Sequence, residues 1–227
     1  MKNSDAKTTE PQYQRLLELQ AEMGLAPLGL MTNQVWHDDP RRLVFVLSRY
    51  KFAAKMLSGK KHVLEIGCGD AFGTRIVAQE VGRVCAIDFD PIFIRDIKER
   101  MVAKFSFDCQ EHDILNAPVE GGFDAAYSID VIEHIPKKDE GLFMRNIVAS
   151  LLPQGVCIIG TPSIQSQVYA CDQSKAGHVN CKDHKELKSL MESYFHHVFI
   201  FSMNDEVVHT GFYPMAHYLF AIGAGTR

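Results

Sequence analysis

Residues 62–74, with the sequence HVLEIGCGDAFGT, constrain the fold more than any other part of the chain. An apolar run at 63–66, interrupted only by Glu65, ends in glycines, as buried parallel strands often do. Gly67 and Gly69 permit a tight turn with close backbone approach, and a helical pattern follows. Strand, glycine turn and helix together predict the first unit of a nucleotide-binding α/β domain.

The turn departs from the dinucleotide-binding pattern G-x-G-x-x-G, because its third glycine, Gly73, comes one residue late. Two carboxylates, Glu65 and Asp70, flank the loop. They would repel a pyrophosphate but suit a cationic ligand. Asp88 ends the next apolar run, about twenty residues further on, where a carboxylate would bind ribose hydroxyls.

The sequence EIGCG at 65–69, followed by AID at 86–88, resembles the class I S-adenosylmethionine-dependent methyltransferases. The resemblance extends over about residues 42–222. It implies an α/β fold, a Rossmann-like three-layer sandwich. Its sheet would have seven strands, mostly parallel, with one antiparallel strand near the C-terminal edge. It also implies S-adenosyl-L-methionine as the cofactor and S-adenosyl-L-homocysteine as the product of a transferase.

Strands and helices alternate regularly after residue 62, which predicts a parallel sheet with helices on both faces and ligands at the carboxyl ends of the strands. The expected strands are 63–67, 83–88, 104–109, 123–129, 155–162, 197–201 and 215–222. The expected helices are 13–23, 40–57, 71–81, 91–103, 138–152 and 182–195, with a long polar loop at 162–181. We divide the chain into a polar N-terminal tail and lid segment, 1–40, and a methyltransferase domain, 41–227.

Composition limits the kinds of binding partner and the cellular compartment that we expect for this chain. The net charge of −4 argues against nucleic acid as the main partner, so a small-molecule acceptor is expected. No stretch approaches the roughly 20 apolar residues of a membrane span, and the N-terminus lacks the apolar core of a secretion signal. Three of six cysteines lie in or beside predicted core strands, the pattern of a cytoplasmic protein with free thiols. The oligomeric state is not predicted.

The resemblance assigns donor-binding roles along the strand ends. It places the amino-acid part of the donor near Glu65, Gly67 and Gly69. Asp88 would take the ribose hydroxyls, and Phe89 would pack on the adenine.

Two later strand ends complete the predicted donor site. After the third strand, Asp113 would accept from the adenine amino group, and Ile114 would supply an apolar contact. At the end of the fourth strand, Ser128 would lie beneath the methionine moiety.

Two histidines are candidate catalytic bases for an acceptor that must lose a proton. The stretch 130–134, DVIEH, resembles small-molecule O-methyltransferases of the quinone-biosynthesis type, and a histidine side chain such as His134 is suited to act as a general base near neutral pH. Alternatively, Glu133 and His134 only begin the next crossover. His178, in the polar loop after the fifth strand, is the second candidate, and it could equally be a solvated loop residue.

Residues before the first strand commonly cover the ligand in methyltransferases, so Trp36, Arg49 and Tyr50 are candidate lid residues. For Tyr50, packing against the sheet is an equal alternative.

A zinc site is a further interpretation of the polar loop. Its possible ligands are Cys171, His178, Cys181 and His184, but they lack the paired short spacings of common structural sites. We therefore predict no metal site.

Three functions remain open from the sequence. A methyltransferase acting on a small polar acceptor, with a hydroxyl as the methylated group on a sugar or other metabolite, explains the motifs together. A nicotinamide-dependent oxidoreductase leaves Glu65 and the shifted third glycine unexplained. A non-catalytic S-adenosylmethionine-binding module would keep the pocket without chemistry.

Overall fold

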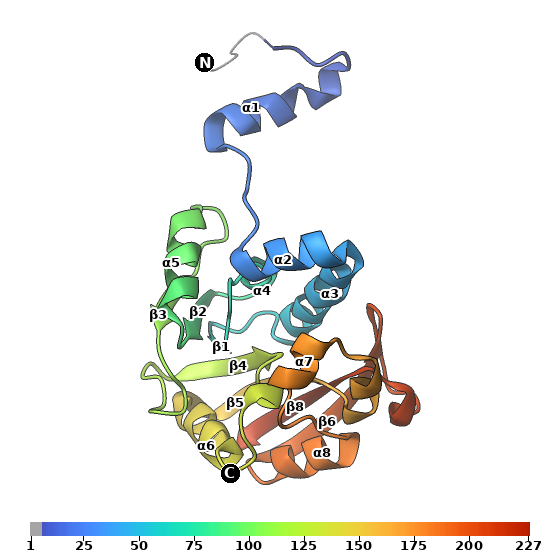
Figure 1. Ribbon diagram of the computed structural model, residues 1–227. Coiled ribbons are helices and arrows are strands. Elements are labelled where there is room, and N and C mark those ends of the chain that lie inside the picture. Colours follow the sequence, from blue (N-terminus) through green and yellow to red (C-terminus); the bar gives the residue numbers. More distant parts are fainter. Residues whose placement is uncertain (1–5) are drawn as a thin grey trace.

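The computed structural model describes residues 6–227, so residues 1–5 of the predicted N-terminal tail lie outside the described residues. One eight-stranded sheet has helices on both faces, which gives three layers (Figure 1). The strands are β1 His62–Ile66, β2 Arg83–Asp88, β3 Asp108–Glu111, β4 Phe123–Ile129, β5 Leu151–Pro162, β6 Phe195–Asn204, β7 Val207–His209 and β8 Tyr218–Thr226. Their order across the sheet is β3-β2-β1-β4-β5-β8-β6-β7.

The α-helices are α1 Gln14–Met23, α2 Leu30–Asp38, α3 Pro40–Met56, α4 Thr74–Val77, α5 Pro91–Arg100, α6 Glu140–Ser150, α7 Asp172–Gly177 and α8 His184–Glu192. Short 3-10 helices are η1 Pro11–Tyr13, η2 Ile132–His134, η3 Ile164–Tyr169 and η4 Tyr213–Met215. Helix α1 has no buried residue and lies apart from the rest in Figure 1. None of the helices in 6–227 is long and apolar enough to cross a membrane.

The predicted α/β sandwich is confirmed, but its sheet has eight strands rather than seven. The additional strand is β7, which pairs antiparallel to β6 from Ser202–His209 to Asn204–Val207. Sequence reasoning read this segment as a connection. A turn at Asp205, whose φ is 48°, folds it back onto β6. Two strands, β7 and β8, therefore run against the others instead of the one expected.

Three expected elements differ in extent for local reasons. The helix expected over 71–81 is reduced to α4, because the chain leaves the glycine turn through residues 70–73 and turns again before Gly82. Strand β3 begins four residues later than expected, after a left-handed residue at Phe105. The expected loop 162–181 contains the short helices η3 and α7.

The two faces of the sheet pack against different helices. Leu64 and Ile66 of β1 face the core beneath α6 and α8, whereas Val63 packs with α3 and α4 on the other face. Because side chains alternate along a strand, Glu65 points to the same face as Val63. It is 2% exposed, so a carboxyl group lies inside the core directly below the glycine turn.

A buried ion pair fixes the segment that leads from α7 into α8. The Lys182 side chain is 2% exposed, and its ammonium pairs with Glu140 of α6 and donates to the side-chain oxygen of Asn180 at 2.8 Å. Asn180 also donates to Glu140 at 3.0 Å. The same carboxylate binds Lys137 at 2.8 Å, but that side chain is 71% exposed. Removal of one partner of a buried pair leaves an uncompensated charge.

We therefore expect Lys182→Met to lower the free energy of unfolding by about 3 kcal/mol. The matched control, Lys137→Met, breaks an exposed contact to the same carboxylate and should cost less than about 1 kcal/mol. Urea unfolding of both variants measures the difference. Equal losses in the two variants would contradict the structural importance of the buried pair.

Candidate functional site

The glycine turn after β1 forms the floor of the site. Gly67 and Gly69 have φ values of 70° and 52°, a region that glycine adopts without strain. A Cβ on Gly67 would lie 2.4 Å from a methyl carbon of Val131, so the two chain segments approach too closely for a side chain. The amide of Gly69 donates to Asp88 Oδ2 at 2.8 Å, which ties the turn to the end of β2.

Glu65 supports the turn from below. The hydroxyls of Thr74 and Tyr127 both donate to Glu65 Oε2, at 2.6 and 2.7 Å. Burial raises the pKa of Glu65 to about 7, although these two hydrogen bonds favour the ionised form. This residue holds α4 and β4 against β1, and in this structure it does not line the pocket above.

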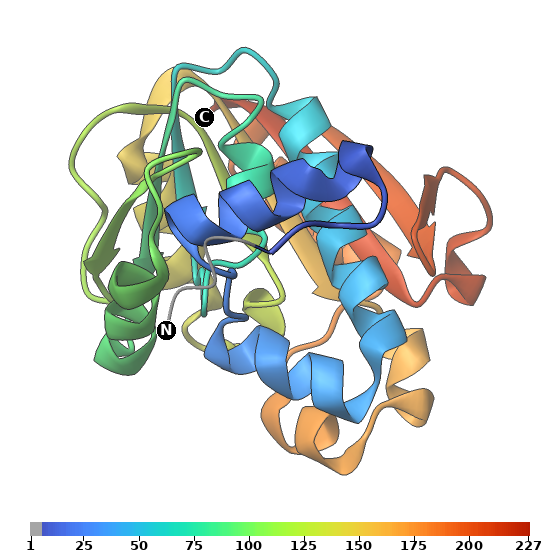
Figure 2. The ribbon, with the colours of Figure 1, turned by 90° about the horizontal axis from the view of Figure 1, so that it is seen from above.

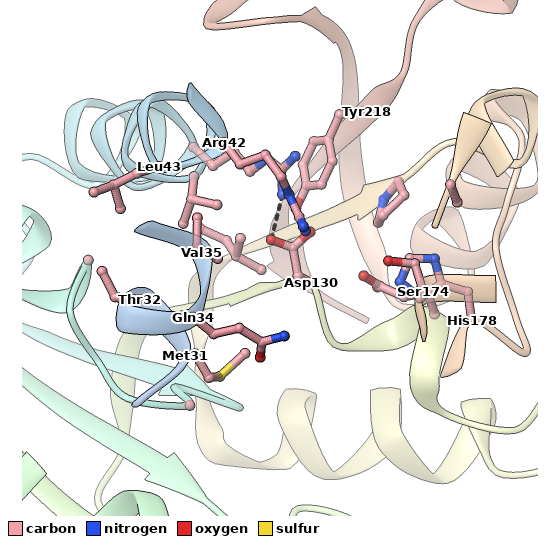
Figure 3. Close-up of a pocket in the computed structure, with 18 of the residues that line it drawn as sticks. Met31, Thr32, Gln34, Val35, Arg42, Leu43, Asp130, Ser174, His178 and Tyr218 are labelled. Carbon is pink, nitrogen blue, oxygen red and sulfur yellow. Dashed lines mark hydrogen bonds and ion pairs between the residues drawn. The ribbon is translucent and has the colours of Figure 1, made fainter. Parts of the chain in front are cut away.

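A pocket of about 520 Å³ opens above the turn. Figure 3 shows α2 residues on one side of it, His178 and Ser174 on the opposite side, and Asp130 between them. The lining residues used below are Met31, Gln34, Arg42, Arg49, Gly67, Gly69, Asp130, Glu133, His134, Gln173, Ser174, His178 and Tyr218.

Helix α2 lies over the turn. The buried carboxylate of Asp70 accepts the amide of Thr32 at 2.7 Å, and Met31 lies against Gly69. At the other side of the pocket, Gln34 donates to Gln173 of α7 at 3.3 Å, and Figure 2 shows the two helices side by side. These contacts come from the segment 1–40, where we predicted a lid.

Of the candidate lid residues, Arg49 and Tyr50 line the pocket, whereas Trp36 does not. Arg49 pairs with Asp130 Oδ2 at 2.6 Å and lies 3.9 Å from the centre of the Tyr218 ring. Tyr50 packs edge-on against Tyr127, so it belongs to the core and to the pocket wall together.

Asp130 follows β4 with a φ of 59°, an uncommon conformation for a residue with a side chain. Its Oδ1 is buried and has no hydrogen-bond partner in residues 6–227. Such strain recurs at functional sites, where the surrounding structure holds it in place. Here the Arg49 guanidinium on the other oxygen supplies that support.

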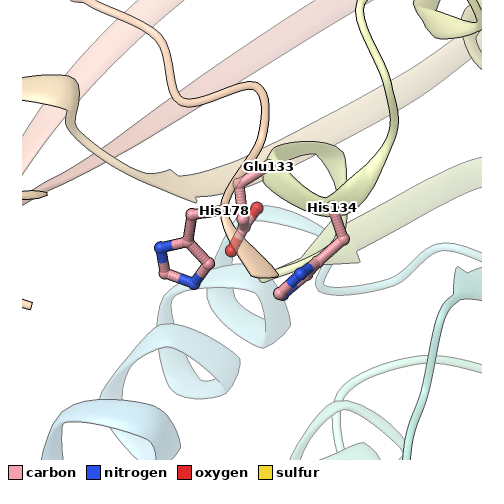
Figure 4. A group of neighbouring side chains, drawn as sticks. All are labelled: Glu133, His134 and His178. Atoms are coloured by element: carbon pink, nitrogen blue, oxygen red, sulfur yellow. The ribbon is translucent and has the colours of Figure 1, made fainter. Parts of the chain in front are cut away.

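Both candidate bases lie at one end of this pocket, together with Glu133 (Figure 4). One possible ligand atom from each of Glu133, His134 and His178 lies within 4.8 Å of the others. The backbone carbonyl of Glu133 accepts the amides of Val179 and Asn180, at 2.8 and 3.0 Å. These bonds bring the His178 loop against η2, which neither sequence segment predicts alone.

Hydrogen bonds fix the tautomers of both imidazoles. His134 Nδ1 lies 3.0 Å from the carbonyl of Gly177, which only accepts, so this nitrogen carries the proton. His178 Nδ1 lies 2.8 Å from the side-chain oxygen of Gln167, whose amide nitrogen donates to the Ser163 carbonyl at 3.3 Å. Neither Nε2 atom has a hydrogen-bond partner among residues 6–227, so each can accept a proton or bind a cation. Burial and the neighbouring His134 lower the pKa of His178.

Glu133 is fully buried. Its Oε2 accepts the hydroxyl of Thr161 at 3.0 Å, whereas Oε1 has no partner among the described residues. Burial, with the nearby charge of Asp130, raises the pKa of Glu133 to about 8.

The remaining predicted donor residues lie at the same edge of the sheet but outside this pocket. Asp88 is buried and accepts from Gly69 and Asp90, and Phe89 beside it is 71% exposed. Asp113 caps its own turn by accepting from Leu115.

Two further predicted donor residues are buried. Ile114 lies in the core cluster with Val119 and Phe123. The hydroxyl of Ser128 donates to the carbonyl of Ile66 at 3.2 Å, so it joins β4 to β1 under the turn.

The residues present fit S-adenosylmethionine. A carboxylate has about four acceptor positions, and Asp88 uses two of them for amides, which leaves acceptors for ribose hydroxyls. Phe89 presents an exposed ring next to that carboxylate. Gly67 and Gly69 leave the backbone open to the amino-acid part of the donor.

The alternative zinc set is not assembled in the described residues. His178 joins Glu133 and His134, not Cys171, Cys181 and His184. Sequence reasoning also missed Met31 and Gln173 as pocket residues, because they come from helices whose side chains carry no motif.

Comparisons with known proteins agree with this geometry. Residues 63–155 match a family described as a methyltransferase domain. A probable S-adenosylmethionine-dependent methyltransferase of Mycolicibacterium smegmatis is 27% identical over 115 residues, 50% of this chain and 42% of that protein. A ubiquinone biosynthesis O-methyltransferase of Coxiella burnetii is 26% identical over 125 residues, 53% of this chain and 52% of that protein. The matches thus span about half of these relatives or less.

A solved structure shows the same fold. The N-methyltransferase NodS of Bradyrhizobium japonicum, in complex with S-adenosyl-L-homocysteine, superposes with a TM-score of 0.57 at 17% identity. The match covers 84% of this chain and 90% of that one.

Glu65 gives a prediction for stability against pH. Its pKa is raised in the folded protein, from 4.5 to about 7, so its contribution is fully present below pH 4.5 and is lost as the pH rises through 7. We expect wild type to lose about 3 kcal/mol relative to Glu65→Gln between these pH values. Urea unfolding at several pH values measures it, with exposed Glu111→Gln as the control for the lost charge. If the difference in unfolding free energy between wild type and Glu65→Gln does not change with pH, the raised pKa of Glu65 is contradicted.

Proposed function

We propose that the chain is a class I S-adenosylmethionine-dependent methyltransferase, as its sequence predicted, with S-adenosylmethionine as cofactor, and that it methylates a hydroxyl of a small polar acceptor. The supporting observation is one pocket that runs from the glycine turn to two imidazoles with free Nε2 atoms.

Methyl transfer from a sulfonium is a direct displacement. The acceptor oxygen forms a bond to the methyl carbon, the bond from carbon to sulfur breaks, and the electron pair stays on sulfur. Holding the two reactants in line can supply roughly 7–11 kcal/mol of the barrier. Asp130 and Gly67 both line the pocket, at the adjacent ends of β4 and β1, which favours methyl delivery between them.

We assign the donor to the glycine edge. In this proposal Gly67 and Gly69 face its amino-acid part, Asp88 accepts from the ribose hydroxyls, and Phe89 packs on the adenine. Glu65 acts indirectly, because it supports the turn through Thr74 and Tyr127. Asp113 stays assigned to the adenine end, whereas Ile114 and Ser128 support the site from the core.

The acceptor end carries polar groups from three elements. Gln34 comes from α2, Arg42 from α3, and Gln173 and Ser174 from α7. Amides, a guanidinium and a hydroxyl suit a hydroxylated molecule better than a flat apolar one. One relative is named an O-methyltransferase and one solved neighbour is named an N-methyltransferase, so these names do not distinguish oxygen from nitrogen as the methylated atom. Our choice of a hydroxyl therefore rests on the polar groups of the pocket.

The two alternative functions lack comparable support. Asp70 and Glu65 near the turn disfavour a pyrophosphate, and the comparisons found methyltransferases rather than oxidoreductases. A binding module without catalysis would leave the free Nε2 atoms of His134 and His178 without a role.

The donor assignment predicts a specific loss of affinity. We expect S-adenosyl-L-homocysteine to bind wild type, and Asp88→Ala to weaken binding by about 1–3 kcal/mol because hydrogen bonds to a charged group are lost. Calorimetry checks this, with exposed Asp108→Ala of β3 as the control. Unchanged affinity in a folded Asp88 variant, or tight binding of a nicotinamide dinucleotide to wild type, would overturn the assignment.

The acceptor assignment predicts a loss of turnover without loss of donor affinity. Release of S-adenosyl-L-homocysteine is measured against a panel of monosaccharides, diphenols and hydroxy acids. With the best acceptor, His134→Ala and His178→Ala should lower turnover by roughly 10²–10⁴-fold. Exposed His196→Ala of β6 should not. Wild-type turnover in both pocket variants would show that neither histidine acts on the acceptor.

A further inference from the structure

The group of Glu133, His134 and His178 has the composition and geometry of a metal site. Its three possible ligand atoms lie within 4.8 Å of one another. Ligands on one transition-metal ion lie about 2.0–2.2 Å from it, so atoms on opposite sides are at most about 4.4 Å apart. His134 is exposed, and rotation of its side chain can supply the small remaining movement.

The unpartnered oxygen of Glu133 is a second, independent indication. The side chain is fully buried, yet Oε1 has no hydrogen-bond partner in the described part of the chain. No ion pair joins Glu133 to a lysine or arginine within residues 6–227, because Arg49 is engaged by Asp130. A buried acceptor without a partner is costly, and a bound cation would satisfy it.

The hydrogen bonds behind the two imidazoles are those found at metal centres. A metal-binding histidine usually donates its other ring N–H to a carbonyl or carboxylate, which fixes its tautomer and orientation. His134 does so to Gly177, and His178 to Gln167. Thr161 likewise donates to the second oxygen of Glu133. Each of the three side chains is therefore held by an outer hydrogen bond.

We propose that Glu133, His134 and His178 bind a divalent transition-metal ion at the acceptor end of the pocket. Two imidazoles and one carboxylate suit Mn²⁺, Fe²⁺, Co²⁺ or Zn²⁺, and three ligands on one side leave positions open toward the pocket. This goes against our sequence analysis, which predicted no metal and considered only the cysteine-containing set.

The role of the ion rests on the proposed function. An acceptor hydroxyl bound to the ion would lose its proton more readily, as metal-bound water does. The proton passes to solvent, the resulting oxyanion bonds to the methyl carbon, and the sulfur retains the electron pair as S-adenosyl-L-homocysteine leaves. The histidines would then act on the acceptor through the ion rather than as bases.

The test measures Mn²⁺ binding to the full chain, purified without a histidine tag and treated with chelator. Calorimetry and electron paramagnetic resonance should show one ion per chain. Glu133→Gln and His134→Ala should each weaken binding by at least about tenfold. His134 is exposed, so its variant stays informative if Glu133→Gln fails to fold. His196→Ala, far from the pocket on β6, is the matched control.

Three results would overturn the proposal. The first is no stoichiometric Mn²⁺ binding, and the second is equal binding in wild type and both pocket variants. The third is a binding loss in Cys171→Ser or Cys181→Ser but not in His134→Ala. Donor binding is measured on the same preparations without metal. If S-adenosyl-L-homocysteine binds but Mn²⁺ does not, the proposed function stands and this inference fails. If Mn²⁺ binds but the donor does not, the inference holds and the proposed function fails.

Discussion

The parallel pairing of β1 with β4 is the constraint on which the site depends. Ile66 lies opposite Ser128, so the two strands end at the same edge and their following residues continue side by side. That register places Val131 against Gly67 and leaves no room for a side chain on the glycine. A shift of one residue would turn Glu65 out of the core and separate the glycine turn from Asp130.

Five side-chain carboxyl groups are buried among the described residues, and the fold accommodates them in different ways. Glu65 accepts two hydroxyls, Asp70 and Asp88 accept backbone amides, and Glu140 pairs with Lys182. Glu133 keeps one buried oxygen, Oε1, without a partner in the described residues, as does Oδ1 of Asp130 nearby. The first four each accept hydrogen bonds or pair with a cation inside the fold. Glu133 and Asp130 both line the pocket, where a cation or a substrate group can meet the free oxygens.

Sequence reasoning predicted a donor edge from signals that are local. Glycine spacing, Glu65 and Asp88 lie within one strand–turn–helix–strand unit, and the order of the elements follows from their alternation. It failed where contacts join distant segments. The backbone hydrogen bonds from Val179 and Asn180 to the carbonyl of Glu133 join residues more than forty positions apart in the sequence. No periodicity of the sequence predicts such a contact. The environment of Ile114 was open for a related reason, since an apolar residue after a strand can face either ligand or core, and here it packs in the core cluster.

The lid is attached at two points of unequal strength. Its anchor is a buried, charge-assisted bond from Thr32 to Asp70, next to the glycine turn. Its far contact is an exposed amide-to-amide bond from Gln34 to Gln173. Since water competes with the second bond and not with the first, we expect the α7 end of α2 to separate from the pocket more readily than the end at Asp70.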